Sequence, residues 1–216
     1  MGREIPTFIT QIRSWHDRQC NAPHLILAPS VMNEGPLLTF ESPARLQIPK
    51  ERLSGLTERL LENGVDPKRW FVVIHYREPT YSLRPARRFR DASAKPFQEL
   101  TNRIIQELGG QVVRVGHPSM TPFPEQDGFV DLSGVDEDAF DLHTFAISRA
   151  RFMVAASSGP LQIAFSLGTP TARANSITPA EIPGAWNEHD LVLHRNLFCR
   201  RNPRSVEDAL AAGFFN

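Results

Sequence analysis

The chain has 216 residues, 41% of them hydrophobic and 22% charged, which is enough to bury a sizeable core in one large domain. Its 24 basic and 24 acidic residues give a formal net charge of +0, which argues against a general nucleic-acid or anionic-membrane binder, because such proteins carry surplus positive charge. The sequence contains no apolar run long enough for a transmembrane segment and no signal-peptide core at its start. With only two distant cysteines, Cys20 and Cys199, we expect a reduced cytoplasmic protein, although a single disulfide stays open.

The first 69 residues predict helical and extended structure without a complete sheet. Apolar residues recur at helical spacing over residues 5–15, and residues 24–29 resemble a short buried strand. Residues 30–50 hold several prolines and predict an extended connection, and four leucines between Leu53 and Leu61 share one face of a helix. We interpret residues 1–69 as a helical appendage or the remnant of an acceptor domain.

From Trp70 onward, short strands alternate with helices. Residues 70–76 form a dense aromatic and β-branched run, typical of a strand buried on both faces. The elements expected after it are a helix over 96–108, strands over 111–116 and 128–132, a helix over 140–150, a strand over 151–155, a helix over 161–167 and a last strand over 169–174. This alternation predicts βαβ units on a parallel, Rossmann-like sheet, that is, an α/β domain over residues 70–216.

Two serines and a glycine stand where one buried strand gives way to a helix. Ser157, Ser158 and Gly159 follow the strand over 151–155, and Pro160 suits the first turn of a helix. Ligands of open parallel sheets bind beyond the carboxyl ends of the strands, and a helix start offers free N–H groups to an anion. The turn predicts a phosphate site, and the alternative is a serine-capped helix without a ligand.

The strongest strand ends in two groups that suit the same ligand. His75 and Arg77 are two residues apart and therefore share a face, and the fork of an arginine pairs well with phosphate oxygens. The following loop is rich in arginine, including Arg90. Arg114 and Gly116 lie at the end of the next strand. We expect these groups to converge on one anionic ligand, and the alternative for His75 is a hydrogen bond to the backbone.

Other chemistries have less support. The acidic run at residues 136–141 lies at a predicted helix start, where carboxylates favour the helix dipole. There is no zinc spacing, dinucleotide-binding glycine pattern or P-loop, and the turn lacks the glycine of a nucleophile elbow. We therefore expect no metal site and no resident cofactor.

The motifs taken together resemble a family of bacterial glycosyltransferases linked to surface carbohydrate synthesis. "WFVVIHYRE", "RFRDAS", "GGQVVRVGHPSM", "FVDLS" and "RFMVAASSGPLQIAFSLGTPTARAN" occur in that family's order, and the likeness covers Trp70 to the end. The resemblance implies a GT-B architecture of two facing Rossmann-like domains, of which this chain would be the C-terminal, donor-binding half. Tyr76 and Glu78 depart from the pattern, as does the lack of a full N-terminal domain.

Carried onto this sequence, the resemblance implies where each role falls. The His75-x-Arg77 element is similar to that of fucosyltransferase-like enzymes, whose arginine contacts the donor pyrophosphate. The expected donor-binding residues are Arg77, Arg90, Arg114, Gly116, Ser157, Ser158, Gly159 and Asn175. The expected catalytic residues are Arg77, His75 and Asp91. The general base stays open between Asp91, Glu78, His75 and a group from a missing domain or partner chain.

We therefore expect a metal-independent glycosyltransferase, or its donor-binding half, that takes a nucleotide-sugar as substrate and an unknown acceptor: a glycan, a lipid-linked sugar or a protein. The alternatives are a nucleotide-sugar-binding module without catalysis and another sugar enzyme on the same scaffold, such as an epimerase or pyruvyl transferase. The expected setting is cytoplasmic or peripheral at the inner membrane, with a homo-oligomer or a partner domain left open.

Overall fold

A computed structural model describes residues 45–79, 90–135, 139–176, 189–194, 197–199 and 202–204. The chain divides into two compact units, Met1–Pro43 and Ala44–Asn216, and every described residue belongs to the second. The helix expected over residues 5–15 and the strand expected over 24–29 lie outside the described residues.

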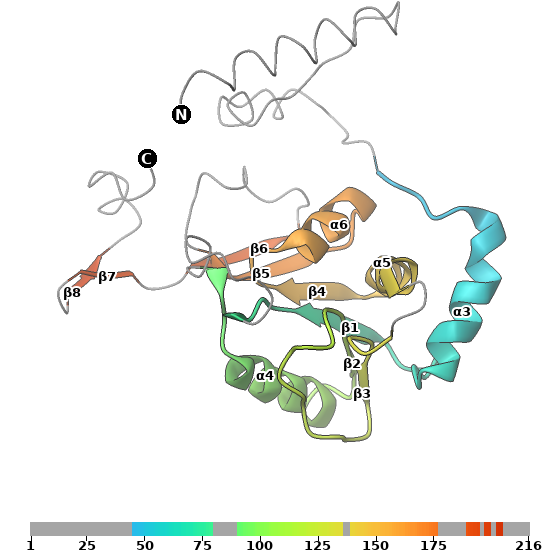
Figure 1. The fold of residues 1–216 in the computed structure, drawn as a ribbon, viewed down its shortest axis with the longest axis horizontal. Helices are drawn as coiled ribbons and strands as arrows, with labels where there is room; N and C mark the ends of the chain where they lie inside the picture. The colour runs from blue at the N-terminus through green and yellow to red at the C-terminus, as the bar shows by residue number, and fades with distance from the viewer. Residues whose placement is uncertain are drawn as a thin grey trace, which may run out of the picture. The chain divides into compact units, whose positions relative to one another are not determined.

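Six parallel strands form one sheet in the order β3-β2-β1-β4-β5-β6 (Figure 1). Their bounds are β1 Phe71–His75, β2 Gln111–Arg114, β3 Phe129–Asp131, β4 Phe152–Ala155, β5 Thr171–Ser176 and β6 Leu191–His194. In the central strand, Val73 pairs with Val113 on one side and Met153 on the other, and its side chain is fully buried. The order is that of nucleotide-binding Rossmann folds, so the predicted α/β fold class is confirmed.

The sixth strand was not predicted. The last strand expected from the sequence ended at residue 174, but β6 adds a parallel strand beyond β5. Asp190 Oδ1 accepts hydrogen bonds from the N–H of Thr171 at 2.7 Å and from its Oγ1 at 2.9 Å. This contact joins residues that are 19 positions apart in the chain. The spacing of apolar residues around Leu191 reports only local structure, so it could not predict the contact. A separate antiparallel pair, β7 Leu197–Cys199 and β8 Asn202–Arg204, follows.

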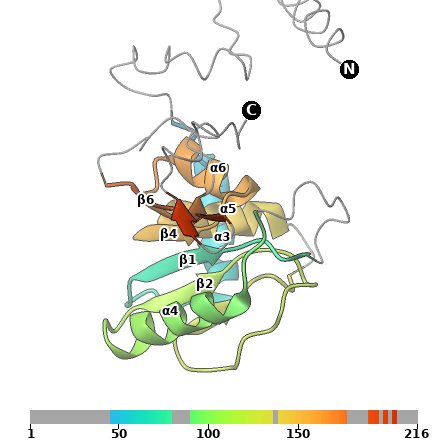
Figure 2. The ribbon, with the colours of Figure 1, turned by 90° about the vertical axis from the view of Figure 1, so that its left-hand side faces the viewer.

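Helices cover both faces of the sheet (Figures 1 and 2). One face packs against α3 Leu53–Glu62, which follows the 3-10 turn η2 Lys50–Arg52, and against α5 Ala139–Arg149 and α6 Gly159–Leu167. The other face packs against α4 Ala94–Gln106 and the segment that contains Met120 and Phe123. The boundaries of α4, α5 and α6 all lie within two residues of their expected positions.

The sheet domain begins before residue 70, which was the boundary expected from the sequence. Leu56 and Leu60 of α3 are each 5% exposed and pack in the same core as Phe145 of α5. They lie on one helical face because they are four residues apart, whereas Leu61, expected on that face, is exposed. Helix α3 is therefore part of the sheet unit, which starts at Ala44. None of the described helices is long and apolar enough to span a membrane.

The carboxyl ends of β1, β2 and β4 meet at one edge of the sheet. The N–H of Val115 donates to the carbonyl of Ile74, and the N–H of Ala156 donates to the carbonyl of His75, both at 3.1 Å. The chain leaves β1 toward β2 on one side, while β4 lies on the other side. This reversal of strand order opens a crevice at the strand ends, where α/β proteins place their ligands.

Candidate functional site

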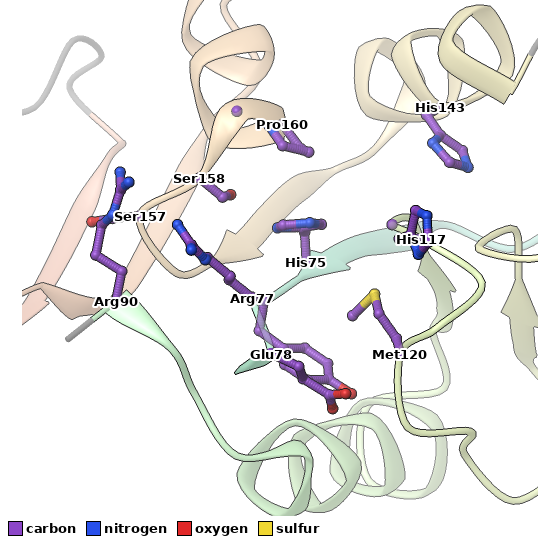
Figure 3. Close-up of a pocket in the computed structure, with 13 residues that line it drawn as sticks. His75, Arg77, Glu78, Arg90, His117, Met120, His143, Ser157, Ser158 and Pro160 are labelled. Carbon is purple, nitrogen blue, oxygen red and sulfur yellow. The ribbon is translucent and has the colours of Figure 1, made fainter. Parts of the chain in front are cut away.

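A cavity of about 470 Å³ lies at this edge, between the segments that follow β1 and β4 (Figure 3). It is lined by His75, Tyr76, Arg77, Glu78, Arg90, Gly116, His117, Met120, His143, Ser157, Ser158, Gly159 and Pro160. The structure thus brings together six of the eight expected donor-binding residues. The two that it places elsewhere are Arg114 and Asn175.

Strand alternation directs the groups at the end of β1. Val72, Ile74 and Tyr76 pack in the core on the α4 side, so His75 and Arg77 project from the opposite face. Figure 3 shows both side chains directed into the cavity, with Arg77 extending toward the serine turn. This is the shared face that the sequence predicted.

Arg77 is held by a buried carboxylate. Its Nε lies 3.1 Å from Asp91 Oδ1, and each side chain is 9% exposed. The N–H of Ala92 also donates to the carbonyl of Arg77 at 2.8 Å. Asp91 was one of the three candidate bases, but it does not line the cavity. Its position suits the fixing of Arg77 rather than contact with a reacting atom.

The serine turn has the geometry of an anion site. Ser158 is the N-cap residue of α6, with extended backbone, but its side chain makes no capping hydrogen bond. The Oγ atoms of Ser157 and Ser158 are both buried, and neither has a hydrogen-bond partner in the part of the chain that the structure describes. A buried hydroxyl without a partner is costly, so these two atoms point to a bound polar group. The side chain of Ser158 does not cap the helix, so the alternative of an ordinary serine cap does not describe it.

Gly159 leaves room at the helix start. A Cβ added there would meet nothing within 4 Å, and Pro160 occupies the first turn as expected. Gly159 and Pro160 both line the cavity, so the N-terminus of α6 lies against it, and the helix dipole adds partial positive charge at the same point.

Gly116 shapes the opposite wall. Its φ is +155°, and a Cβ added there would lie 2.2 Å from Met120 Sδ. The positive φ favours glycine at this position, and a side chain there would require Met120 to shift. Arg90, which also lines the cavity, begins the described chain after residue 79. Three arginines of the intervening loop, at positions 84, 87 and 88, lie outside the described residues.

Arg114 differs from the expectation because of the same strand alternation. Val112 packs in the core on the α4 side, and Arg114, two residues later, points to that side as well. It forms an ion pair with Asp131, its Nε 3.1 Å from Oδ1, and its guanidinium stacks 4.5 Å from the ring centre of Phe123. At 1% exposure, Arg114 holds the β2 and β3 ends together and lies away from the cavity.

Asn175 is also outside the cavity lining. Its φ of +55° is left-handed, a conformation that asparagine tolerates better than most residues. It lies where the pairing of β5 with β6 shifts register between Arg173 and Ser176. The structure gives Asn175 a place in a strand irregularity.

Two histidines that line the cavity were not among the residues expected from the sequence. His117 follows Gly116, and His143 lies on α5. Both line the cavity together with His75, as Figure 3 shows. His143 Nε2 lies 2.9 Å from the carbonyl oxygen of Leu132, to which it donates. His117 was within a quoted motif and could have been found there. His143 had no local signal, because its helix position alone does not show what it faces.

Burial alters the titration of the cavity groups. Burial, with a smaller contribution from His143, lowers the pKa of His75 to about 4. Burial likewise lowers the pKa of His143. Burial and the neighbouring Glu78 raise the pKa of Tyr76 to about 12. His75 and His143 are therefore neutral imidazoles at neutral pH.

Glu78 is the acidic residue among those that line the cavity. Its Oε2 accepts hydrogen bonds from the N–H of Thr121 at 2.8 Å and from its Oγ1 at 3.1 Å. Of the three candidate bases, His75 and Glu78 line the cavity. Over the ranges that the structure describes, no group of three or more His, Cys, Asp or Glu residues could hold a metal ion. Residues 136–138 of the acidic run lie outside those ranges.

Comparison with known proteins gives fold neighbours only. No family model matches the chain, and no curated protein does. Among solved structures, it is similar to the ADP-heptose LPS heptosyltransferase II of Escherichia coli, with 17% identity and a TM-score of 0.53 over 73% of this chain and 46% of that one. It is also similar to a glycosyl transferase family 9 protein from Veillonella parvula, with 16% identity and a TM-score of 0.52 over 80% of this chain and 48% of that one. The chain spans about half the length of either structure, and at such identities the likeness shows a shared fold.

Proposed function

We propose that the protein is a glycosyltransferase, or the donor-binding half of one, that uses a nucleotide-sugar. One observation carries the proposal: a helix start, a fixed arginine and two serine hydroxyls without a partner among the described residues meet in a cavity at the switch point of the sheet. Arginine forks and helix N-termini are the groups that proteins use for phosphates. The fold shared with two glycosyltransferases supports the same class.

The chemistry would be displacement at the anomeric carbon of the donor sugar. The oxygen of an acceptor hydroxyl forms a bond to that carbon as the bond from carbon to the diphosphate oxygen breaks. The proton of the hydroxyl passes to a general base, for which His75 and Glu78 are the candidates that line the cavity. The electron pair leaves with the nucleoside diphosphate, whose negative charge grows in the transition state. Arg77 and the first N–H groups of α6 are placed to stabilise that charge, and such preorganised groups are a large source of catalysis. Arg90 adds a second positive charge at the same end of the cavity.

The acceptor falls within the same proposal. One fold neighbour is by its name a lipopolysaccharide heptosyltransferase, which fits the family resemblance to surface carbohydrate synthesis. We extend the proposal to an acceptor of that kind, a glycan or a lipid-linked sugar. No residue of this chain is assigned to acceptor binding.

Binding and turnover test the proposal separately. A thermal-shift panel of ADP, UDP and GDP, each with and without EDTA, should show one stabilising nucleotide whose effect survives the chelator. A ligand at 100 times its dissociation constant stabilises the folded state by about 2.7 kcal/mol. The matching nucleotide-sugar should then release its nucleoside diphosphate in the presence of a glycan extract, detected by mass spectrometry. Absence of any nucleotide effect would contradict the proposal, and binding without release would restrict it to donor binding.

A further inference from the structure

One wall of the cavity is formed by a short stretch of chain between β2 and β3. This stretch, residues 116–121, is called the wall segment below, and it contributes Gly116, His117 and Met120 to the lining. Figure 3 shows the side chain of Met120 directed into the cavity. The N–H of Met120 donates to the carbonyl of His117 at 3.0 Å, which shapes a turn within the segment. A bond between such near neighbours does not attach the turn to the sheet.

Two strand ends hold the wall segment at its last residue, Thr121. Glu78, which follows β1, accepts hydrogen bonds at Oε2 from the N–H of Thr121 at 2.8 Å and from its Oγ1 at 3.1 Å. Arg114, the last residue of β2, donates from Nη1 to the carbonyl of Thr121. The N–H, the hydroxyl and the carbonyl of Thr121 are therefore all bound by side chains from the ends of β1 and β2. The contact with Glu78 joins residues that are 43 positions apart, so it anchors the segment over a long range.

The carboxylate of Glu78 is directed toward this anchor. Tyr76 packs on the α4 side of the sheet, and Glu78, two residues later, points to the same side. Figure 3 shows the side chains of Glu78 and Arg77 extending in opposite directions. Glu78 is buried, and a buried carboxylate needs hydrogen-bond donors, which Thr121 supplies. The alternative role of a general base would use Oε1 of Glu78, which is buried and has no hydrogen-bond partner among the described residues.

We propose that Glu78 is a positioning residue that holds the wall segment against the cavity through Thr121. Its effect on ligand binding rests on the proposed function, and the role differs from that of a general base. Hydrogen bonds to a charged acceptor are stronger than neutral ones, so loss of Glu78 should allow residues 116–121 to open locally while the core stays folded. A ligand that needs the closed wall would then bind more weakly, because only the closed fraction of the protein can accept it.

Met120 reports directly on the position of the wall. It is buried in the wall segment, and Met153 of β4 is buried in the core on the other face of the sheet. Hydrogen peroxide converts accessible methionine to the sulfoxide, and mass spectrometry of peptides measures the rate at each position. Opening of the wall alone raises the oxidation rate of Met120, whereas general loss of stability raises the rates of both methionines.

The variants differ in the acceptor that they leave for Thr121. Glu78→Leu leaves none, so the oxidation rate of Met120 should rise about tenfold, the scale of one hydrogen bond to a charged group, with Met153 unchanged. Glu78→Gln keeps an amide oxygen that can accept from Thr121, and it should recover most of the protection. Thr121→Val removes only the hydroxyl and keeps the N–H, so its rise should be smaller than that of Glu78→Leu. Glu99→Leu is the matched control, because the side chain of Glu99 is 64% exposed, and it should change neither rate.

The same variants connect the wall to the ligand. The nucleoside diphosphate that stabilises the wild type best is titrated calorimetrically into each protein. Its dissociation constant should rise about threefold in Glu78→Leu, because part of the binding energy is used to close the wall, and Glu78→Gln should recover most of the affinity. At saturation the nucleotide should return the oxidation rate of Met120 in Glu78→Leu toward that of the wild type.

Three results would overturn the inference and leave the proposed function standing. The first is an oxidation rate of Met120 in Glu78→Leu equal to that of the wild type. The second is an equal rise at Met120 and Met153, which would make Glu78 a residue of general stability. The third is an open wall in Glu78→Leu with unchanged affinity for the nucleotide. A wild type that binds no nucleoside diphosphate contradicts the proposed function, whereas the oxidation rates still decide whether Glu78 holds the wall.

Discussion

Arg77 and Asp91 form an ion pair that is buried on both sides, with Nε 3.1 Å from Oδ1 and each side chain 9% exposed. The carboxylate belongs to the segment that precedes α4, and the arginine follows β1. The pair therefore joins the carboxyl end of the central strand to the start of the next helix. It also fixes the group that we place against the phosphates.

Removal of Asp91 should destabilise the protein, because it leaves a buried guanidinium without this counter-ion. We expect Asp91→Ala to lower the free energy of unfolding by about 3 kcal/mol, the range found for one broken partner of a buried pair. Urea denaturation measures the change. Asp127→Ala is the matched control, because Asp127 pairs with Arg69 at 3.3 Å but its side chain is 98% exposed, and it should have no measurable effect. Equal effects of the two substitutions would show that the Arg77–Asp91 pair adds little to the free energy of unfolding.

His75 should make the protein less stable in acid. The pKa of His75 is about 4 in the folded protein and near 6.5 when unfolded, so the unfolded chain binds the proton more readily between these values. Stability is therefore lost as the pH falls from about 6.5 toward 4, and lowering the pH from 7 to 5 should remove roughly 2 kcal/mol through this group. Urea denaturation at both pH values, in wild type and in His75→Asn, isolates the contribution. A wild type and variant with the same pH dependence would contradict it.

The Arg114–Asp131 pair should matter for folding and not for ligand binding. The side chain of Arg114 is 2% exposed and that of Asp131 33%, so Asp131→Ala leaves a buried guanidinium without this counter-ion. We expect a loss of about 2 kcal/mol in the free energy of unfolding. The affinity for a nucleoside diphosphate should stay unchanged, since neither residue lines the cavity. A clear loss of affinity in a folded Asp131→Ala protein would return Arg114 to the site.

Gly116 should not accept a side chain. Its φ of +155° disfavours other residues, and a Cβ would lie 2.2 Å from Met120 Sδ, so Gly116→Ala should lower the free energy of unfolding by roughly 2 kcal/mol. Gly134→Ala is the matched control, because a Cβ at Gly134 would meet nothing within 4 Å. Thermal denaturation of the two variants gives the comparison. Similar melting temperatures would mean that the chain relaxes around Gly116 without strain.

Local sequence patterns were sufficient for most of the fold. The buried run that contains Val72 to Ile74 and the apolar spacing around Phe97 and Ile104 predicted β1 and α4, because burial on two faces or on one face leaves a periodic signature. Strand β6 left no such signature. Its place depends on the contact between Asp190 and Thr171, and a contact between distant residues cannot be found from periodicity.

Residues that line the cavity could be predicted where the ends of strands determine their position. They could not be predicted where tertiary packing brings them to the cavity. His75, Arg77 and the Ser157–Ser158 turn all follow strands, and the carboxyl ends of parallel strands meet at one edge. Arg114 also ends a strand, but it points to the α4 side of the sheet, away from the cavity. His143 reaches the cavity from a helix, through the packing of α5 on the sheet, which the sequence does not reveal.

We propose above that the phosphates of a nucleotide-sugar bind to Arg77 and to the turn from Ser157 to Gly159. Calorimetric titration of a nucleoside diphosphate into wild type, Arg77→Ala and Gly159→Val tests it most directly. Arg77→Ala should weaken binding by roughly 2–3 kcal/mol, the scale of a hydrogen bond to a charged group, and Arg77→Lys should recover only part of this because it lacks the fork. Gly159→Val should fold, since a Cβ there meets nothing, yet it should bind weakly because its methyl groups enter the space of the phosphate. Equal affinities in all of the folded variants would contradict the account and leave α6 as a helix with an empty cavity beside it.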